Sequence, residues 1–242
     1  MKVVLNPPVE ALLVDLDGTL LTNRMFPLQI DFVVKMVSAL SHQTGVRKAA
    51  SILLAVKRQL ETPSNNETND LRALHVLSQQ LNMTLEQSRT LGKETLATVF
   101  PTLKRHFTPA PGAKEFLDWA KNHYPLYLAT NPVWPLEITE LRVKWAGVDP
   151  SIFKAITYAN NSRACKPDKI FYEDILKQNG LEAEKCLLIG DELKMDLPAT
   201  VCGIRVFIVG KYSEIKALQF KGANAPAWRG TYKMLRSILE TQ

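Results

Sequence analysis

Two aspartates stand two positions apart after an apolar run, in the segment ALLVDLDGTLLT at residues 11–22. An ionised carboxylate within an apolar sequence is costly to bury without a partner. Asp15 and Asp17 are therefore predicted to take part in catalysis or in cation binding. Two carboxylates supply a nucleophile, a general acid or base, or ligands for a hard cation. A plain turn after a strand is the structural alternative.

Polar side chains follow three other apolar runs in the same way. They are Thr130, Asn131, Lys166 and Asp191. Ligands bind beyond the carboxyl ends of the strands in a parallel sheet, so we expect these groups to meet the aspartates at one edge. Gathered carboxylates repel one another unless a cation lies among them, and oxygen ligands favour Mg²⁺.

Each of these residues also has an ordinary structural explanation. Thr130 could simply end a strand, and Lys166 could simply precede a helix. Asp191 follows a glycine and could be a helix N-cap. The chemical interpretation depends on their common position at strand ends.

Five short apolar runs predict the strands that must position these side chains, at 11–16, 125–130, 155–158, 186–190 and 204–209. Helical patterns at 111–123, 135–146 and 167–179 alternate with them, and the second is expected to bury Ile138, Leu141 and Trp145. This alternation is typical of βαβ crossovers. The predicted fold class is α/β, a Rossmann-like parallel sheet with helices on both faces.

About a hundred residues separate the first two strands, many more than a crossover helix needs. Helical patterns fill this stretch at 30–40, 48–60, 70–81 and 85–100, and a capping box of Thr84 and Gln87 opens the last. A polar loop at 61–69 lies between two of them. The predicted organisation is a core of residues 1–22 and 108–242 with a helical insert of residues 23–107.

Composition narrows the class of protein further. A chain of 242 residues with 46% hydrophobic content buries a sizeable core. No apolar stretch approaches the ~18 residues of a membrane span, and three cysteines without metal-ligand spacing argue against a disulfide framework. We therefore expect a cytoplasmic protein that binds no membrane.

The net charge of +6 comes largely from one segment, residues 211–242. Apolar residues recur there at helical spacing, at Trp228, Tyr232, Leu235 and Leu239, which predicts one helix packed on the core. A basic, solvated outer face explains the charge better than nucleic-acid binding does. The sequence is silent on oligomeric state.

Four segments taken together resemble the ordered motifs of the haloacid dehalogenase-like hydrolases. They are DLDGTL at 15–20, LATN at 128–131, CKPDKIF at 165–171 and GDELKMD at 190–196. The resemblance spans residues 11 to about 210. The insert is similar in position and helical content to the family's α-helical cap, which closes over the site.

The resemblance implies a division of roles. Asp15 would be the nucleophile that forms an aspartyl-phosphate, and Asp17 would protonate the leaving oxygen and then activate water. Mg²⁺ would be held by Asp15, by the backbone carbonyl of Asp17 and by Asp191. Thr130 and Lys166 would contact the phosphoryl group, with Asn131 beside them in substrate binding.

Four further residues have expected roles outside this main division. Arg24, where the cap begins, is a candidate for contact with a substrate anion or for steadying the hinge. Asp196 is expected to orient Lys166 or a metal-bound water, and Glu192 to reach the metal through water or to face solvent. Cys165, where relatives often carry glycine, is expected to be a packing residue.

The sequence thus predicts a Mg²⁺-dependent phosphatase acting on a small phosphorylated metabolite. Dehalogenases and phosphonate hydrolases of the family lack an acid at the position of Asp17, so they fit less well. A phosphomutase keeps the same residues and stays open. An alternative of another class is a non-catalytic binding module that uses the basic C-terminal segment.

Overall fold

The computed structural model describes residue 3, residues 5–62 and residues 66–242. Seven strands form its main sheet: β1 Ala11–Val14, β4 Leu126–Leu128, β5 Phe153–Ile156, β6 Cys186–Gly190, β7 Arg205–Val209, β8 Lys216–Leu218 and β9 Ala227–Gly230. Their order is β5-β4-β1-β6-β7-β9-β8, and only β8 runs antiparallel to its neighbour. The carboxyl ends of the parallel strands therefore lie at one edge of the sheet.

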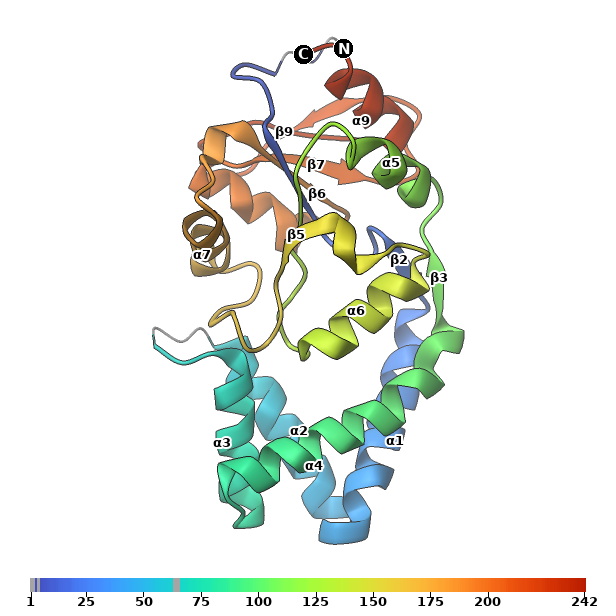
Figure 1. Cartoon of the computed structure of the whole chain (residues 1–242), viewed down its shortest axis with the longest axis vertical. Coiled ribbons are helices and arrows are strands. Elements are labelled where there is room, and N and C mark those ends of the chain that lie inside the picture. The colour runs from blue at the N-terminus through green and yellow to red at the C-terminus, as the bar shows by residue number, and fades with distance from the viewer. Residues whose placement is uncertain (1–2, 4, 63–65) are drawn as a thin grey trace.

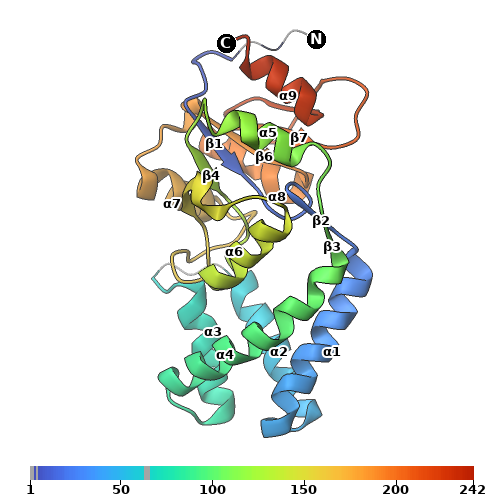
Figure 2. The ribbon, with the colours of Figure 1, turned by 45° about the vertical axis from the view of Figure 1, so that its right-hand side comes forward.

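Helices cover both faces of this sheet, as predicted (Figures 1 and 2). Helices α5 Ala113–Ala120 and α9 Tyr232–Leu239 pack on one face, and α7 Lys169–Asn179 with the 3₁₀ helix η4 Leu197–Cys202 packs on the other. Strands β1, β6 and β7 are buried along their whole length. Burial on both faces explains why they are continuous apolar runs in the sequence. The α/β, Rossmann-like fold class is confirmed.

The prediction of one helix from Trp228 to Leu239 is wrong at its start. Trp228 lies on strand β9, and α9 begins only after Thr231, whose hydroxyl accepts a hydrogen bond from the Met234 N–H at 3.2 Å. The four apolar side chains of the stripe are all buried in one cluster. A strand followed by a capped helix therefore buries the same residues that the periodicity assigned to one helix.

The insert consists of α1 Met25–Thr44, α2 Val46–Glu61, α3 Asn69–Leu81, α4 Leu85–Val99 and the 3₁₀ helix η1 Phe100–His106. The predicted capping box at Thr84 and Gln87 is present. Figure 1 shows these helices at the end of the molecule away from both termini. Residues 63–65 of the predicted loop 61–69 lie outside the described residues.

Two short strands join the insert to the core, β2 Leu21–Asn23 and β3 Phe107–Pro109. They pair antiparallel, so the chain leaves and re-enters the core at one place (Figure 2). The boundaries expected from the sequence, after residues 22 and 107, fall within this pair. We refer to the pair β2–β3 as the hinge.

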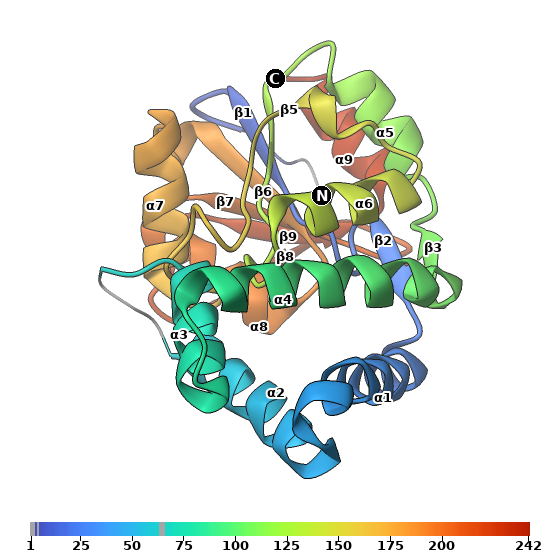
Figure 3. The same ribbon diagram turned by 60° about the horizontal axis from the view of Figure 1, so that its bottom comes forward.

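A second junction links the insert to the core at the start of α3. Asn69 is fully buried there, its N–H donates to the carbonyl of Ser162 at 2.8 Å, and its Nδ2 donates to the carbonyl of Pro132 at 3.0 Å. Trp134 packs edge-on against Phe100, with ring centroids 4.7 Å apart. The insert therefore contacts loops at the carboxyl ends of the strands, as the view in Figure 3 also shows.

Within the described residues, no helix has the length and apolar character needed to cross a membrane. The cysteines Cys165, Cys186 and Cys202 are free thiols, which agrees with the predicted lack of a disulfide framework. Burial raises the pKa of Cys165 to about 11. Its thiol is therefore protonated at neutral pH, in keeping with a packing role.

Candidate active site

A small cavity of about 60 Å³ lies at the carboxyl ends of β1, β4 and β6. Its lining residues are Asp15, Asp17, Thr130, Asn131, Lys166, Asp191, Glu192, Met195 and Asp196. Eight of these nine were singled out from the sequence, and Met195 was not. Arg24 does not line the cavity and is exposed at the start of α1, so its contact with substrate stays a prediction.

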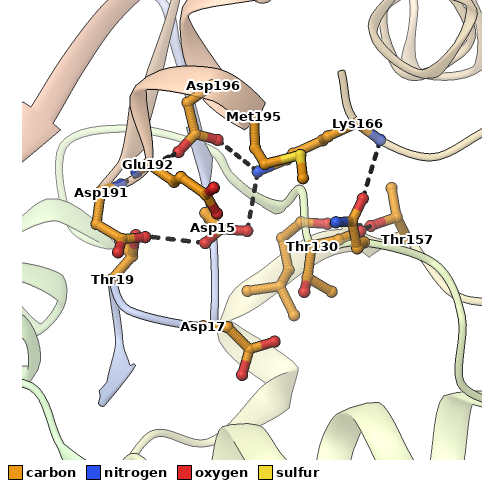
Figure 4. A network of polar contacts seen from close by, with 12 residues as sticks. Asp15, Asp17, Thr19, Thr130, Thr157, Lys166, Asp191, Glu192, Met195 and Asp196 are labelled. Atoms are coloured by element: carbon orange, nitrogen blue, oxygen red, sulfur yellow. Dashed lines mark hydrogen bonds and ion pairs between the residues drawn. The ribbon is translucent and has the colours of Figure 1, made fainter. Parts of the chain in front are cut away.

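Lys166 is the cation at the centre of this cavity. Its Nζ donates to Asp15 Oδ1 at 2.8 Å and to Asp196 Oδ1 at 2.7 Å (Figure 4). Burial opposes the charge of Lys166, but Asp15 and Asp196 more than offset that cost and raise the pKa of the ammonium. Lys166 is thus a fixed positive charge between two carboxylates.

Both carboxylate oxygens of Asp196 accept hydrogen bonds from other groups of the protein. Its second oxygen, Oδ2, accepts the N–H groups of Asp191 at 3.1 Å and Glu192 at 3.0 Å, where β6 leads into α8 Leu193–Asp196. A Cβ at Gly190 would lie 2.1 Å from Asp196 Oδ2, so only glycine permits this approach. Asp196 therefore holds both Lys166 and the turn that carries Asp191.

The arrangement of Asp15, Asp191 and Asp196 fits a divalent cation. One ligand atom from each carboxylate lies within 4.8 Å of the others. Since Asp196 is occupied, Asp15 and Asp191 are the candidate ligands, and the Thr19 hydroxyl links them at 3.4 Å and 3.2 Å. Three carboxylates against one ammonium leave two negative charges in surplus. A divalent cation that prefers oxygen donors, such as Mg²⁺, would balance these two negative charges.

The strand-end residues of β4 support Lys166 from the other side. Asn131 Oδ1 accepts the backbone N–H of Lys166 at 2.9 Å, and the Thr130 carbonyl accepts a 2.6 Å hydrogen bond from the Thr157 hydroxyl. Thr130 itself is almost fully buried. Asn131 therefore joins the loop after β4 to the loop that carries Lys166, and its amide NH₂ group is left for a ligand.

A family model described as haloacid dehalogenase-like hydrolase matches residues 9–201. The chain belongs to the haloacid dehalogenase-like hydrolases. No curated protein matches this hydrolase in sequence.

Solved structures resemble this hydrolase over nearly its whole length. A 2-haloacid dehalogenase from Pseudomonas syringae is 18% identical with a TM-score of 0.65, covering 96% of this chain and 99% of its own. A HAD phosphatase from Thermococcus onnurineus is 22% identical with a TM-score of 0.57, covering 96% and 98%. A putative HAD-hydrolase from Bacillus subtilis bound to magnesium is 19% identical with a TM-score of 0.54, covering 96% and 99%. At these identities the likeness shows the fold.

The two candidate ligands of this hydrolase bind protons more tightly than ordinary aspartates. Burial raises the pKa of Asp15 to about 7, and the charge of Asp196 adds to the effect although Lys166 opposes it. Burial, again with Asp196, raises the pKa of Asp191 to about 6. Without a cation, the folded protein therefore keeps protons that the unfolded chain releases near pH 4.

We expect the stabilisation by Mg²⁺ to grow between pH 5 and pH 8. These raised pKa values make the metal-free protein lose stability as pH rises from about 4 to 7, because the folded state holds more protons. Mg²⁺ replaces those protons, so its increase in Tm is larger at pH 8. Thermal unfolding in EDTA and in Mg²⁺ at both pH values tests this. An equal increase at pH 5 and pH 8 would contradict it.

Besides Met195, the structure adds Arg142, on helix α6 Leu136–Trp145, which the sequence analysis also missed. The apolar pattern predicted Leu141 and Trp145 as buried, but both are only half-buried, whereas Arg142 is buried. Its guanidinium donates to Asp17 Oδ1. No sequence signal marks such a residue, since a charged side chain on a helix ordinarily faces solvent.

Proposed function

We propose that this hydrolase is a Mg²⁺-dependent phosphatase that acts on a small phosphorylated metabolite through an aspartyl-phosphate. The observation that carries the proposal is the different setting of two carboxylates on one cavity. Asp15 is buried against Lys166. The Asp17 side chain is 39% exposed and lies apart from the carboxylates of Asp15, Asp191 and Asp196 (Figure 4). Two tasks, nucleophile and acid–base catalyst, suit these two settings.

The first step is attack by Asp15 on phosphorus. Lys166 donates to Asp15 Oδ1, and among the described residues Oδ2 accepts only the 3.4 Å hydrogen bond from Thr19. The carboxylate is therefore oriented and still has free lone pairs. An oxygen–phosphorus bond to Asp15 forms as the ester oxygen–phosphorus bond breaks. Asp17, protonated on Oδ2 while Oδ1 accepts from Arg142, gives its proton to the departing oxygen, which leaves as an alcohol.

The second step is hydrolysis of the aspartyl-phosphate. Asp17, now a carboxylate, accepts a proton from the attacking water, and the bond between phosphorus and Asp15 breaks to release inorganic phosphate. Asp17 is thereby protonated again, and Asp15 returns to its starting form. Each group ends the cycle as it began.

Charge on the transferring phosphoryl group needs fixed positive partners. Lys166 supplies one, held in place by Asp196, and the Thr130 hydroxyl is a candidate hydrogen-bond donor on the same cavity. When bound at Asp15 and Asp191, with the Asp17 carbonyl as a further proposed ligand, Mg²⁺ would supply the remaining charge compensation. The magnesium held by the B. subtilis relative is consistent with this choice of cation.

Asp17 distinguishes this proposal from dehalogenation. A halide ion leaves carbon without needing a proton. An alkoxide that leaves phosphorus needs one. Asp17 lines this cavity and is the candidate donor of that proton. The phosphatase from T. onnurineus shares the fold as the dehalogenase does, so the fold itself does not decide between them.

Product analysis tests the proposed reaction. A panel of phosphomonoesters incubated with the enzyme in Mg²⁺ is expected to release inorganic phosphate, and EDTA is expected to stop the release. Asp17→Asn is expected to lower kcat by about 10²- to 10⁴-fold, because the proton donor is lost. A sugar phosphate converted to an isomer without phosphate release would identify a phosphomutase. No turnover of any ester would contradict both.

Other expectations from the sequence stay proposals. We propose a cytoplasmic location, a core and cap divided near residues 22 and 107, and no role for nucleic acid. The proposal that nucleic acid has no role is supported by the charge of the cavity, because Lys166 is the one cation among its lining residues and the charged residues beside it are acidic. Such a cavity suits a cation and one phosphoryl group.

A further inference from the structure

Arg142 is buried in a place that core packing does not explain. Its side chain is 4% exposed, and its Nε is buried without a hydrogen-bond partner among the described residues. The guanidinium carbon lies 5.9 Å from the centre of the Phe107 ring, on the hinge strand β3. A buried charge is costly unless it is paired, so the contact with Asp17 accounts for its presence.

The contact also fixes where the Asp17 carboxylate points. Within the described part of the chain, Arg142 is the cation that pairs with Asp17, while Lys166 pairs with Asp15 and Asp196. Figure 4 shows the Asp17 side chain directed away from the three other aspartates. Asp17 thus pairs with a different cation from Asp15 and Asp196.

We propose that Arg142 is a positioning residue that holds the Asp17 carboxylate on the leaving-group side of the cavity, apart from the proposed cation site. This inference rests on the proposed phosphatase function. The planar guanidinium restricts the direction of a carboxylate more than a flexible ammonium does. Without Arg142, the half-exposed Asp17 side chain rotates freely and spends less time at the leaving oxygen.

Substrates with different leaving groups test this role. p-Nitrophenolate leaves without a proton, whereas the alkoxide from glycerol phosphate needs one. Arg142→Met is expected to lower kcat/KM for glycerol phosphate by about 100-fold and kcat/KM for p-nitrophenyl phosphate by less than about 10-fold. The comparison uses kcat/KM because this constant reports the first step alone, whereas the second step needs Asp17 for both substrates. Substrate binding itself should change little, because Arg142 does not line the cavity. Equal losses of kcat/KM on the two substrates would overturn the proposal.

Arg205→Met is the matched control. Arg205 is also 4% exposed and also has a buried Nε without a partner, but it donates to the carbonyl of Pro7 at the opposite end of the sheet. Its replacement is expected to lower Tm and to leave the ratio of the two kcat/KM values unchanged. A changed ratio in this control would show that loss of any buried arginine has the effect, and would overturn the assignment.

Two more measurements separate this inference from the proposed function. The double variant of Asp17→Asn and Arg142→Met should be no slower than Asp17→Asn, because Arg142 acts through Asp17. If Asp17→Asn lowers kcat/KM equally for both substrates, the proposed acid role of Asp17 fails. If Asp17→Asn discriminates and Arg142→Met does not, only the present inference fails. A crystal structure of Arg142→Met with Asp17 in its original orientation would also refute it.

Discussion

Asp15→Asn is expected to abolish phosphate release while the protein stays folded. An amide oxygen is a poor nucleophile toward phosphorus, so kcat should fall by about 10⁴-fold or more, as for loss of the nucleophile in other hydrolases. The fold should tolerate the change because burial already favours the neutral form of Asp15 in the metal-free protein. Lys166 keeps its 2.7 Å contact with Asp196.

Turnover and thermal unfolding of Asp15→Asn, measured on the same sample, test this expectation. We expect no measurable turnover and a Tm in EDTA close to that of the natural chain. Mg²⁺ should raise the Tm less than it does in the natural chain, since one candidate ligand is lost. Asp118→Asn is the control, because Asp118 forms an exposed ion pair on α5. Full turnover by Asp15→Asn would rule out Asp15 as the nucleophile.

Gly18→Ala is expected to remove most of the affinity for Mg²⁺. Gly18 has φ of +81°, and a Cβ built on it would lie 1.9 Å from Asp191 Oδ2. The Asp191 carboxylate must therefore leave its present position. A displaced ligand should weaken Mg²⁺ binding by about 10- to 100-fold and lower activity at limiting Mg²⁺. Titration of activity and of Tm with Mg²⁺ measures the effect.

Gly222→Ala is a control matched in backbone conformation. Gly222 has φ of +80°, but a Cβ there would meet no atom within 4 Å. It isolates the cost of a left-handed alanine, about 1–2 kcal/mol, from the collision with Asp191. We expect a lower Tm and unchanged Mg²⁺ affinity for Gly222→Ala. Unchanged Mg²⁺ affinity for Gly18→Ala would show that Asp191 is not a ligand.

The charge balance of the cavity underlies both expectations. Asp15, Asp191 and Asp196 outnumber Lys166 by two charges. Burial, with the charge of Asp196 added, raises the pKa values of Asp15 and Asp191. A change that removes one carboxylate or moves it therefore acts on metal binding and catalysis together. Asp196 differs from the other two, because all its oxygens are bound by protein donors.

The sequence by itself determined the α/β class and the strand ends at which Asp15, Thr130 and Asp191 lie. These features depend on local patterns, since a buried parallel strand is an apolar run and its carboxyl end is where polar residues follow. The motif residues could therefore be assigned to one edge of the sheet before any contact was known. The same patterns placed the helical insert between the first two strands.

Only the tertiary structure decided which groups pair. Arg142 meets Asp17 across 125 residues of chain, and Asn69 of the insert meets the Pro132 carbonyl of the core. The apolar pattern of α6 gave no expectation for Arg142, because a pattern records average burial and not the charge opposite one side chain. Trp228 was misplaced on a helix for a related reason. A side chain can be buried in the same core from a strand or from a helix. The spacing of buried residues therefore does not say which of the two carries Trp228.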